Sequence, residues 1–270
     1  MPLAVASQST IRVKLGTSIA LAFPRSPMIM ANLGWDLNVQ SGGRFELGLG
    51  SQVKGHNVRR YSAPWEAPVS RLREYVESIR AIWRCWENCE KLNFEGKHYQ
   101  FSLMSPEFSP PTAYLPLPHI SIAAVGPDML RMAGRIADDA RLHSFCTRKY
   151  IENVCMTRIK EGMARYGRSR EACEISGGGF IATGKDEQAV QQKLEWIRHR
   201  VGFYGSTPTY LPVFEQHGPE ELGLKLHQML VEEKWIELAS QISEDVVRRS
   251  AMTMPYRRRR QSVLAASLTP

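Results

Sequence analysis

Apolar residues in the first fifty positions follow two different spacings. Residues 11–23 form a β-branched, apolar run that predicts a buried strand. Residues 28–40 place apolar side chains at helical spacing, and the Ser-Gly-Gly of 41–43 should end that helix, because glycine adopts the left-handed C-cap conformation easily. A second strand is predicted over 44–49.

The same alternation continues through the middle of the chain. Residues 68–83 predict an amphipathic helix, since their apolar side chains recur at steps of three and four. Residues 92–102 predict a small hairpin and 119–124 a third buried strand. A further helix should begin at the Gly-Pro-Asp of 126–128, because proline is favourable at a first helical position.

The second half of the chain predicts two more strands and four more helices. We expect strands at 140–145 and 175–183, and helices at 148–166, 186–203, 219–229 and 230–242. Near-continuous apolar strands that alternate with helices predict a parallel sheet covered on both faces. The fold class is therefore α/β, with a TIM-type (β/α)8 barrel favoured over an open Rossmann sheet. The Gly-Leu-Gly of 48–50 is not a GxGxxG motif, and no acid stands at the ribose-binding offset.

The positive charge of the chain is concentrated at its carboxyl end. The formal net charge is +8, but six arginines lie after Val247 and no acid follows Asp245, so the rest of the chain carries only +2. We therefore expect one barrel domain over residues 1–247 and a basic, disordered tail over 248–270, with no packed strand. Nucleic acid is not an expected partner, because the basic charge is confined to this tail.

Composition excludes several other classes of protein. No run approaches the roughly 20 apolar residues of a membrane span, and no secretory signal is seen, so we expect a cytoplasmic protein without membrane contact. Cys85 and Cys89 share a helix face, but no second pair stands at zinc spacing, so the five cysteines are expected to be reduced thiols and no metal is expected.

Three predicted strand ends carry residues suited to a ligand, and active sites of parallel α/β proteins lie at such ends. The first is the Gly-Thr-Ser-Ile-Ala of 16–20, where small residues allow close approach to the backbone. The second is 48–52, whose glycines would admit a planar ring or a phosphate and which precedes a basic stretch. The third is 124–129, where a helix start offers free N–H groups to a phosphate.

Each of these strand ends also has an ordinary structural explanation. Small residues at 16–20 can fill the taper of a barrel interior, and the basic residues after position 52 can form a solvated loop. Asp128 would oppose an anion if it pointed inward, so we expect it to cap its own helix.

Taken together, the three segments resemble the luciferase-like monooxygenase superfamily, and specifically its coenzyme F420-dependent branch. The residues that carry the resemblance are LGTSIALAFPRSPMIMA (15–31), SGGRFELGLGSQVKGH (41–56) and AAVGPDMLRMAGRIADD (123–139). They stand in the family's order and at similar spacing, and the likeness covers roughly residues 3–247.

The resemblance implies a set of cofactor contacts. It implies a non-prolyl cis peptide near Ser18-Ile19, against which the tricyclic ring of the cofactor leans. It implies that Ser51 and Gln52 line the side chain of the cofactor. It also implies that the turn of 125–129 binds the phosphate, through the following residues: Val125, Gly126, Asp128 and Met129.

Two departures from the family pattern qualify this expectation. Family members begin with a strand, a helix and a second strand before the segment that starts here at Met1, and those elements carry the groups assigned to proton transfer. The carboxyl end after Val247 does not resemble the family's last strand and helix either. We therefore expect an incomplete barrel from a truncated or frame-shifted reading frame, with unknown catalytic residues. Asp139 also stands where the family prefers glycine.

The resemblance implies an F420-dependent oxidoreductase that transfers a hydride between the deazaflavin and a small organic substrate. An FMN-dependent monooxygenase is the first alternative, because the residues that line the ring differ little between the two. A truncated, non-catalytic fragment that binds the cofactor is an alternative of another class. A homodimer is also expected, because an incomplete barrel has open sheet edges that invite pairing.

Overall fold

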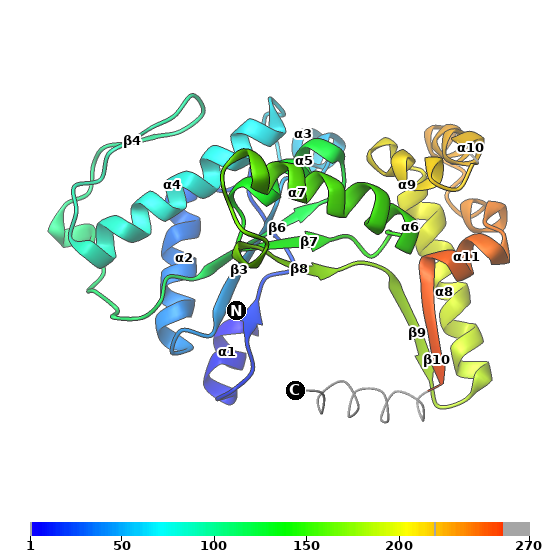
Figure 1. Ribbon diagram of the computed structural model, residues 1–270, viewed down its shortest axis with the longest axis horizontal. Coiled ribbons are helices and arrows are strands. Elements are labelled where there is room, and N and C mark those ends of the chain that lie inside the picture. The colour runs from blue at the N-terminus through cyan, green and yellow to red at the C-terminus, as the bar shows by residue number, and fades with distance from the viewer. Residues whose placement is uncertain (1, 219, 256–270) are drawn as a thin grey trace. The chain divides into compact units, whose positions relative to one another are not determined.

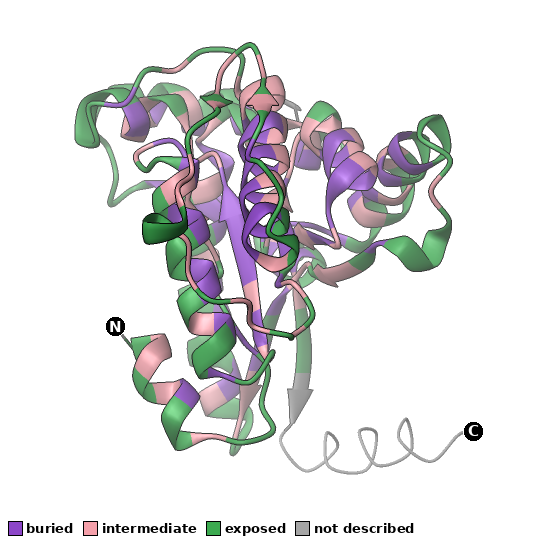
Figure 2. Ribbon diagram, turned by 90° about the vertical axis from the view of Figure 1, so that its left-hand side faces the viewer, coloured by how far each residue is buried: buried purple, intermediate pink, exposed green. Residues whose placement is uncertain are grey.

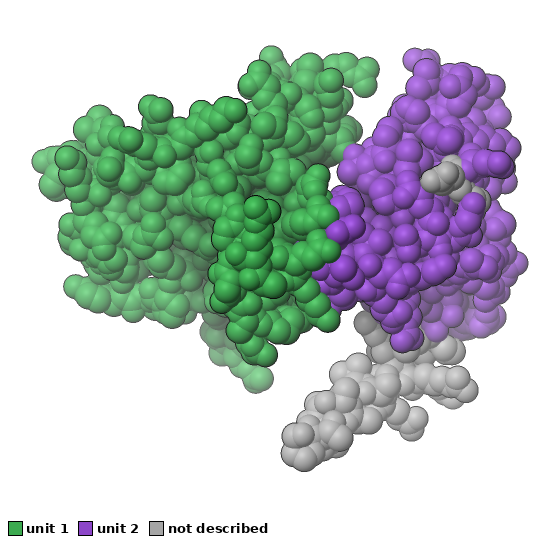
Figure 3. Space-filling model, turned by 45° about the horizontal axis from the view of Figure 1, so that its top comes forward, with its two compact units in different colours: residues 1–124, 128–141, 159–175 green, residues 125–127, 142–158, 176–270 purple. Residues whose placement is uncertain are grey.

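The computed structural model describes residues 2–218 and 220–255, and the chain divides into two compact units (Figure 3). Unit 1 comprises residues 1–124, 128–141 and 159–175, and unit 2 comprises residues 125–127, 142–158 and 176–270.

Unit 1 is built on a sheet in the strand order β1-β3-β6-β7-β8, with β2 also paired to β3. The strands are β1 (Leu15–Gly16), β2 (Ala20–Leu21), β3 (Phe45–Gly50), β6 (His119–Ala124), β7 (Asp139–Leu142) and β8 (Glu174–Gly177). The pairings of β1, β2 and β6 with β3 are parallel. Within the described residues the two ends of this strand order do not pair with each other, so the sheet is a half-barrel. The predicted α/β fold with an incomplete TIM-type barrel is confirmed.

Helices alternate with the strands of unit 1, and two of them, over residues 2–9 and 54–60, were not predicted (Figure 1). They are α1 (Pro2–Ser9), α2 (Pro27–Gln40), α3 (Lys54–Arg60), α4 (Pro68–Asn88), α5 (Pro127–Ile136) and the larger part of α7 (Met156–Arg165). A short antiparallel hairpin, β4 (Phe94–Glu95) with β5 (Gln100–Phe101), follows α4. The basic stretch of 54–60, for which a solvated loop was one explanation, is a helix whose Arg59 and Arg60 are exposed.

Local sequence explains where α2 begins and ends. The Ser26 hydroxyl accepts a hydrogen bond from the Met28 N–H, and Pro27 occupies the first turn, where its missing N–H has no cost. After the helix, Gly42 and Gly43 take positive φ values of 64° and 82°, which glycine adopts without a steric penalty.

The two faces of the half-barrel differ in chemistry. Alternate side chains of β3, β6 and β7 pack toward the helices and are buried: Phe45, Leu47, Leu49, Ile120, Ile122, Ala140 and Leu142. The residues between them are small or polar: Glu46, Gly48, Ser121, Asp139 and Arg141. Figure 2 shows the buried residues gathered along these strands and along the helices beside them. The strands were expected to be apolar on both faces, so this expectation is wrong for the face that lacks helices.

Unit 2 contains a parallel pair of strands covered by helices. Strands β9 (Phe180–Gly184) and β10 (Ala251–Pro255) pair over five positions, from Phe180 opposite Ala251 to Gly184 opposite Pro255. The helices are α6 (Arg148–Tyr150), α8 (Glu187–Gly205), α9 (Leu211–Glu215), α10 (Glu220–Val231) and α11 (Glu244–Ser250), with a π-helical turn at Ile151–Cys155. Buried Val190, Leu194, Ile197 and Val201 of α8 supply its core.

The prediction that residues 248–270 carry no packed strand is wrong. Arg248 and Arg249 belong to α11, where they pair with Glu244 and Asp245, and residues 251–255 form β10. A five-residue segment without alternating hydrophobicity gives no local signal, and it becomes a strand because β9 offers it a complete ladder of backbone partners. Residues 256–270 of the predicted tail lie outside the described residues.

Three other boundaries also differ from the prediction. The strand expected over 175–183 is divided into β8 and β9, because Gly177, Gly178 and Gly179 all have positive φ and interrupt the extended backbone. The strand expected over 140–145 ends at Leu142. The helix expected over 230–242 is absent, since the chain turns at Glu233 with φ 60° and only a 3-10 turn, Leu238–Gln241, follows.

Candidate cofactor site

The first candidate segment forms a bulge between two halves of one strand. β1 and β2 both pair with β3, Leu15 opposite Phe45 and Leu21 opposite Gly50, so the residues between them leave the ladder. The Ser18–Ile19 peptide bond within this bulge is cis, as the family resemblance implied. The Thr17 hydroxyl donates a hydrogen bond of 2.7 Å to the Gly48 carbonyl and attaches the bulge to the next strand.

The glycines of β3 accommodate this bulge. A Cβ atom on Gly48 would overlap the Thr17 carbonyl oxygen, and one on Gly50 would overlap the Ile19 side chain. The expectation that these glycines leave space for a ring or a phosphate is therefore wrong for these two positions, because the protein's own bulge occupies that space. The bulge brings Ile19 onto the carboxyl end of β3, where the Gly50 position is also within van der Waals distance of Ala123.

The second candidate segment is a tight turn directly after β3. Gln52 has a positive φ of 60°, and its side-chain oxygen accepts a hydrogen bond of 3.0 Å from the Val53 N–H. Buried Asn57 donates hydrogen bonds from its amide nitrogen to the carbonyls of Ser51 (2.8 Å) and Val53 (3.1 Å). The Ser51 and Gln52 side chains are half-buried. This turn is thus fixed by α3, an element that the sequence did not predict.

The third candidate segment links β6 to α5. The Tyr150 hydroxyl donates a hydrogen bond of 2.8 Å to the Val125 carbonyl, and a Cβ atom on Gly126 would meet no described atom within 4 Å. Asp128 does not cap α5 as expected; its carboxylate accepts a hydrogen bond of 2.6 Å from Arg131, one turn further along the helix. An arginine three residues away offers a charge-assisted bond, which outcompetes a neutral backbone N–H.

The structure brings the first two segments together within unit 1. Ile19 lies over Gly50, which immediately precedes the Ser51–Gln52 turn, and β6 runs beside β3 with Ile122 opposite Leu49. Asp128 and Met129 belong to unit 1 as well. Val125 and Gly126 group with unit 2.

A polar network that the sequence reasoning missed lies on the face of the sheet that lacks helices. Arg141 donates a hydrogen bond of 2.7 Å to Glu46 and lies 3.4 Å from the Asp139 carboxylate, which also accepts 2.6 Å from the Ser121 hydroxyl. Asp139, the departure from the family's glycine, is therefore held by neighbouring strands. Polar residues at every second position of these strands were the available signal.

His143, immediately after β7, is a half-buried titratable group of unit 2. Its ring lies between Tyr204 and Tyr210, with centroid distances of 4.4 and 4.8 Å, and its Nδ1 accepts a 3.0 Å hydrogen bond from the Phe145 N–H. Burial lowers the pKa of His143 to about 4. The neutral ring therefore carries its proton on Nε2 and can act only as a donor there. A lone histidine in a short segment gave no signal in the sequence.

The described residues contain no group of three or more His, Cys, Asp or Glu placed to hold a metal ion. All five cysteines are free thiols; Cys89 is exposed, and the other four are buried. Within residues 2–218 and 220–255, no helix has both the length and the apolar character of a membrane span.

Comparison with known proteins supports the resemblance seen in the sequence. An uncharacterized protein of Mycobacterium tuberculosis is 40% identical over 255 residues, which cover 94% of this chain and 75% of that protein. A 5,10-methylenetetrahydromethanopterin reductase of Archaeoglobus fulgidus is 26% identical over 252 residues, which cover 91% of this chain and 70% of the reductase.

The fold agrees with a solved structure. The coenzyme F420 dependent tetrahydromethanopterin reductase from Methanopyrus kandleri matches with a TM-score of 0.74 at 20% identity, over 99% of this chain and 78% of that chain. At this identity the likeness concerns the fold alone. The profile of the luciferase-like monooxygenase family matches residues 1–254, so the chain belongs to that family.

Proposed function

We propose that the protein is an F420-dependent oxidoreductase that transfers a hydride between the deazaflavin and a small organic substrate. Membership of the family supports an oxidoreductase, and the 26% identical methanopterin reductase supports a reduction of this kind. One observation carries the proposal: two of the expected contact segments lie side by side at the carboxyl ends of parallel strands. Ile19 of the first segment contacts the Gly50 position, which directly precedes the Ser51–Gln52 turn of the second.

The residues present fit such a cofactor in three respects. Ile19 offers an apolar surface of the kind that an aromatic ring packs on, and the Ser51–Gln52 turn offers hydroxyl and amide groups to a polar side chain. A Cβ atom on Gly126 would meet no described atom within 4 Å, and this open space supports the approach of a phosphate to the N–H groups that begin α5. When bound, F420 supplies the hydride chemistry.

The protein's own contribution would be binding and orientation. Ser18 and Ile19 would support the ring, Ser51 and Gln52 would contact the side chain, and the turn containing Val125, Gly126, Asp128 and Met129 would hold the phosphate through backbone N–H groups. The ion pair between Asp128 and Arg131 supports the last role, because it neutralises the carboxylate nearest to the expected anion.

The first test is titration with F420 and with FMN, followed by fluorescence, for the unmodified protein and two variants. Gly126→Val should weaken binding of the preferred cofactor by at least about tenfold, because a branched side chain fills the open space that the anion needs. Its fold should survive, since no described atom obstructs the new side chain. Arg248→Ala, a matched surface change on α11, should bind as the unmodified protein does.

The titration also decides between the alternatives. Preference for FMN would favour a flavin-dependent monooxygenase, which the family name equally allows. If neither cofactor binds the unmodified protein, the enzyme proposal fails and a non-catalytic member of the family becomes the better description. The expected homodimer and the cytoplasmic location remain proposals, and analytical ultracentrifugation tests the first of them.

A further inference from the structure

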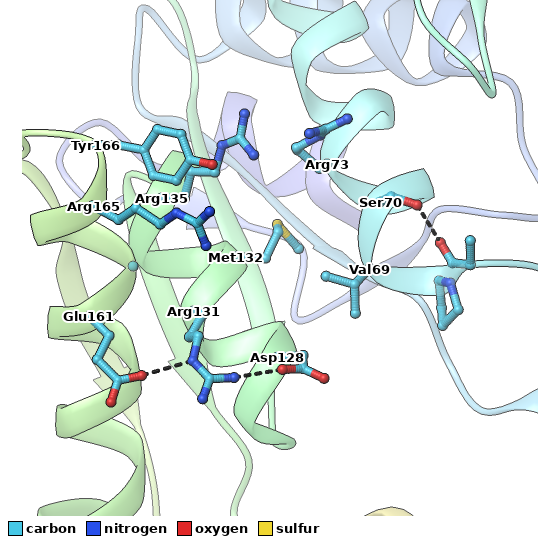
Figure 4. Close-up of a pocket in the computed structure, with 13 residues that line it drawn as sticks. Val69, Ser70, Arg73, Asp128, Arg131, Met132, Arg135, Glu161, Arg165 and Tyr166 are labelled. Atoms are coloured by element: carbon cyan, nitrogen blue, oxygen red, sulfur yellow. Dashed lines mark hydrogen bonds and ion pairs between the residues drawn. The ribbon is translucent and has the colours of Figure 1, made fainter.

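Unit 1 has a groove of about 690 Å³ between its helices (Figure 4). The first turn of α4, one side of α5 and the last turns of α7 line it. Its lining contains four arginines and two acids: Arg73, Arg131, Arg135, Arg165, Asp128 and Glu161. The lining is therefore electropositive, and Figure 4 shows the arginine side chains arranged around the opening.

Two glycines position the wall of this groove. A Cβ atom on Gly134 of α5 would overlap the Ile159 carbonyl oxygen, and one on Gly162 of α7 would overlap the Arg131 carbonyl oxygen. The backbones of α5 and α7 therefore cross in direct contact. This close crossing places the arginines of both helices along one wall.

Two of the arginines are held in place by other side chains. Arg131 donates to Asp128 (2.6 Å) and to Glu161 (2.8 Å), so both acids of the lining are already neutralised. The Arg135 guanidinium lies 4.1 Å from the centre of the Tyr166 ring, which fixes its plane. Preorganised guanidinium groups lose little conformational entropy when they bind an anion.

The other arginines of the groove are less fully paired than Arg131. Arg165 has no hydrogen bond or ion pair within residues 2–218 and 220–255, and it is exposed. Arg73 donates a hydrogen bond of 3.3 Å to Glu74, and Glu77 forms longer ion pairs with Arg73 (3.6 Å) and Arg135 (3.8 Å). The buried Nε of Arg73 also lacks a hydrogen-bond partner among the described residues. The first turn of α4 contains no acid, so its N–H groups and helix dipole add to the positive potential.

We propose that this groove binds a small, multiply charged oxyanion, bearing phosphate or carboxylate groups, through Arg73, Arg135 and Arg165. The planar fork of each guanidinium matches either group in a bidentate manner. An anion bound by all three would satisfy the unpaired donors and relieve the repulsion between neighbouring guanidinium groups. None of the three arginines belongs to the expected cofactor contacts, although Asp128 of the expected phosphate turn also lines the groove.

Isothermal titration calorimetry with pyrophosphate and with citrate tests the proposal on the full chain. At least one of the two should bind, with an affinity that falls as ionic strength rises. Arg135→Ala and Arg165→Ala should each weaken binding by about tenfold or more, because each removes a charge-assisted pair of hydrogen bonds. Arg84→Ala is the matched control, since Arg84 is an exposed arginine of α4 outside the lining, and it should bind as the unmodified protein does.

The result also identifies the ligand class. Binding of pyrophosphate alone indicates phosphate groups, binding of citrate alone indicates carboxylates, and binding of both indicates recognition of charge and shape common to them. The proposal is overturned if neither anion binds the unmodified protein. It is also overturned if Arg84→Ala weakens binding as much as Arg165→Ala does, because binding would then follow net charge. Arg165 is exposed, so its variant remains informative if Arg135→Ala fails to fold.

Discussion

His143 shows how one residue's surroundings set its chemistry. Two tyrosine rings remove its imidazole from water, while the Phe145 N–H occupies its Nδ1. Both effects oppose the charged form, because burial penalises the cation and protonated Nδ1 cannot accept that hydrogen bond. The ring is consequently neutral at physiological pH, with a defined tautomer.

A pH dependence of stability follows from His143. Its pKa is lowered from 6.5 to about 4 in the folded protein, so the unfolded chain binds the extra proton between these values. Stability should therefore be fully present above pH 6.5 and should fall as the pH drops, with His143 contributing a loss of about 2 kcal/mol between pH 7 and pH 5. Urea denaturation at the two pH values measures it.

A variant isolates this contribution from other groups, among them His217, whose pKa is also lowered by burial. In His143→Asn the pH-dependent loss should shrink by about that 2 kcal/mol, while His199→Asn, an exposed position of α8, should retain the full loss. An unchanged pH dependence in His143→Asn would show that the imidazole is not shielded as described.

At the level of elements, the crossing of α5 and α7 depends on two glycines. Gly134→Ala places a methyl group against the Ile159 carbonyl, which is backbone and cannot rotate away. We expect a loss of about 1–3 kcal/mol in the free energy of unfolding, as for other overpacked cores. Gly55→Ala is the control, because its new methyl group meets only the flexible end of Arg59, and it should be neutral or stabilising by up to about 1 kcal/mol. Equal stability of the two variants would contradict the close crossing.

Strand β10 gives a second prediction at this scale. A chain that ends at Ser250 loses the partner of β9, and the backbone groups of Phe180–Gly184 that pair with β10 lose their hydrogen bonds. Its melting temperature should fall by more than about 4 °C, of order 1 kcal/mol or more for a chain of this size. A chain that ends at Pro255 is the comparison that retains β10. If truncation at Ser250 lowers the melting temperature no further than truncation at Pro255, β10 does not stabilise the unit.

At the level of the whole molecule, cofactor binding should appear as stability. A ligand that binds only the folded chain stabilises it by about 2.7 kcal/mol when present at 100 times its dissociation constant. Scanning calorimetry with F420 or FMN should therefore show a raised melting temperature for the unmodified protein and a smaller rise for Gly126→Val at the same concentration. An equal rise in melting temperature for both proteins would show that the Gly126 turn does not contribute to cofactor binding.

Local hydrophobic periodicity predicted most of the strands and helices of the chain, but not α1, α3 or β10. Residues 11–23 and 44–49 could be predicted as strands because hydrophobic periodicity is a local property that each segment carries alone. The structure pairs parts of these segments in parallel as β1, β2 and β3. The positions of the three candidate strand ends followed from the same periodicity. Their role in binding a cofactor remains a prediction.

The contacts between these segments could not be predicted from the sequence, because they join residues that are far apart in the chain. Gly48 and Gly50 receive the bulge at Thr17–Ile19, which lies about thirty residues away in the chain, and β10 exists because β9 lies beside it. The arginine groove likewise depends on the contact between Gly134 and Ile159, on two different helices. Contacts between residues that are distant in the sequence do not alter the hydrophobic pattern of either segment. Each segment alone is compatible with many partners, and its partner is determined only when the whole chain packs.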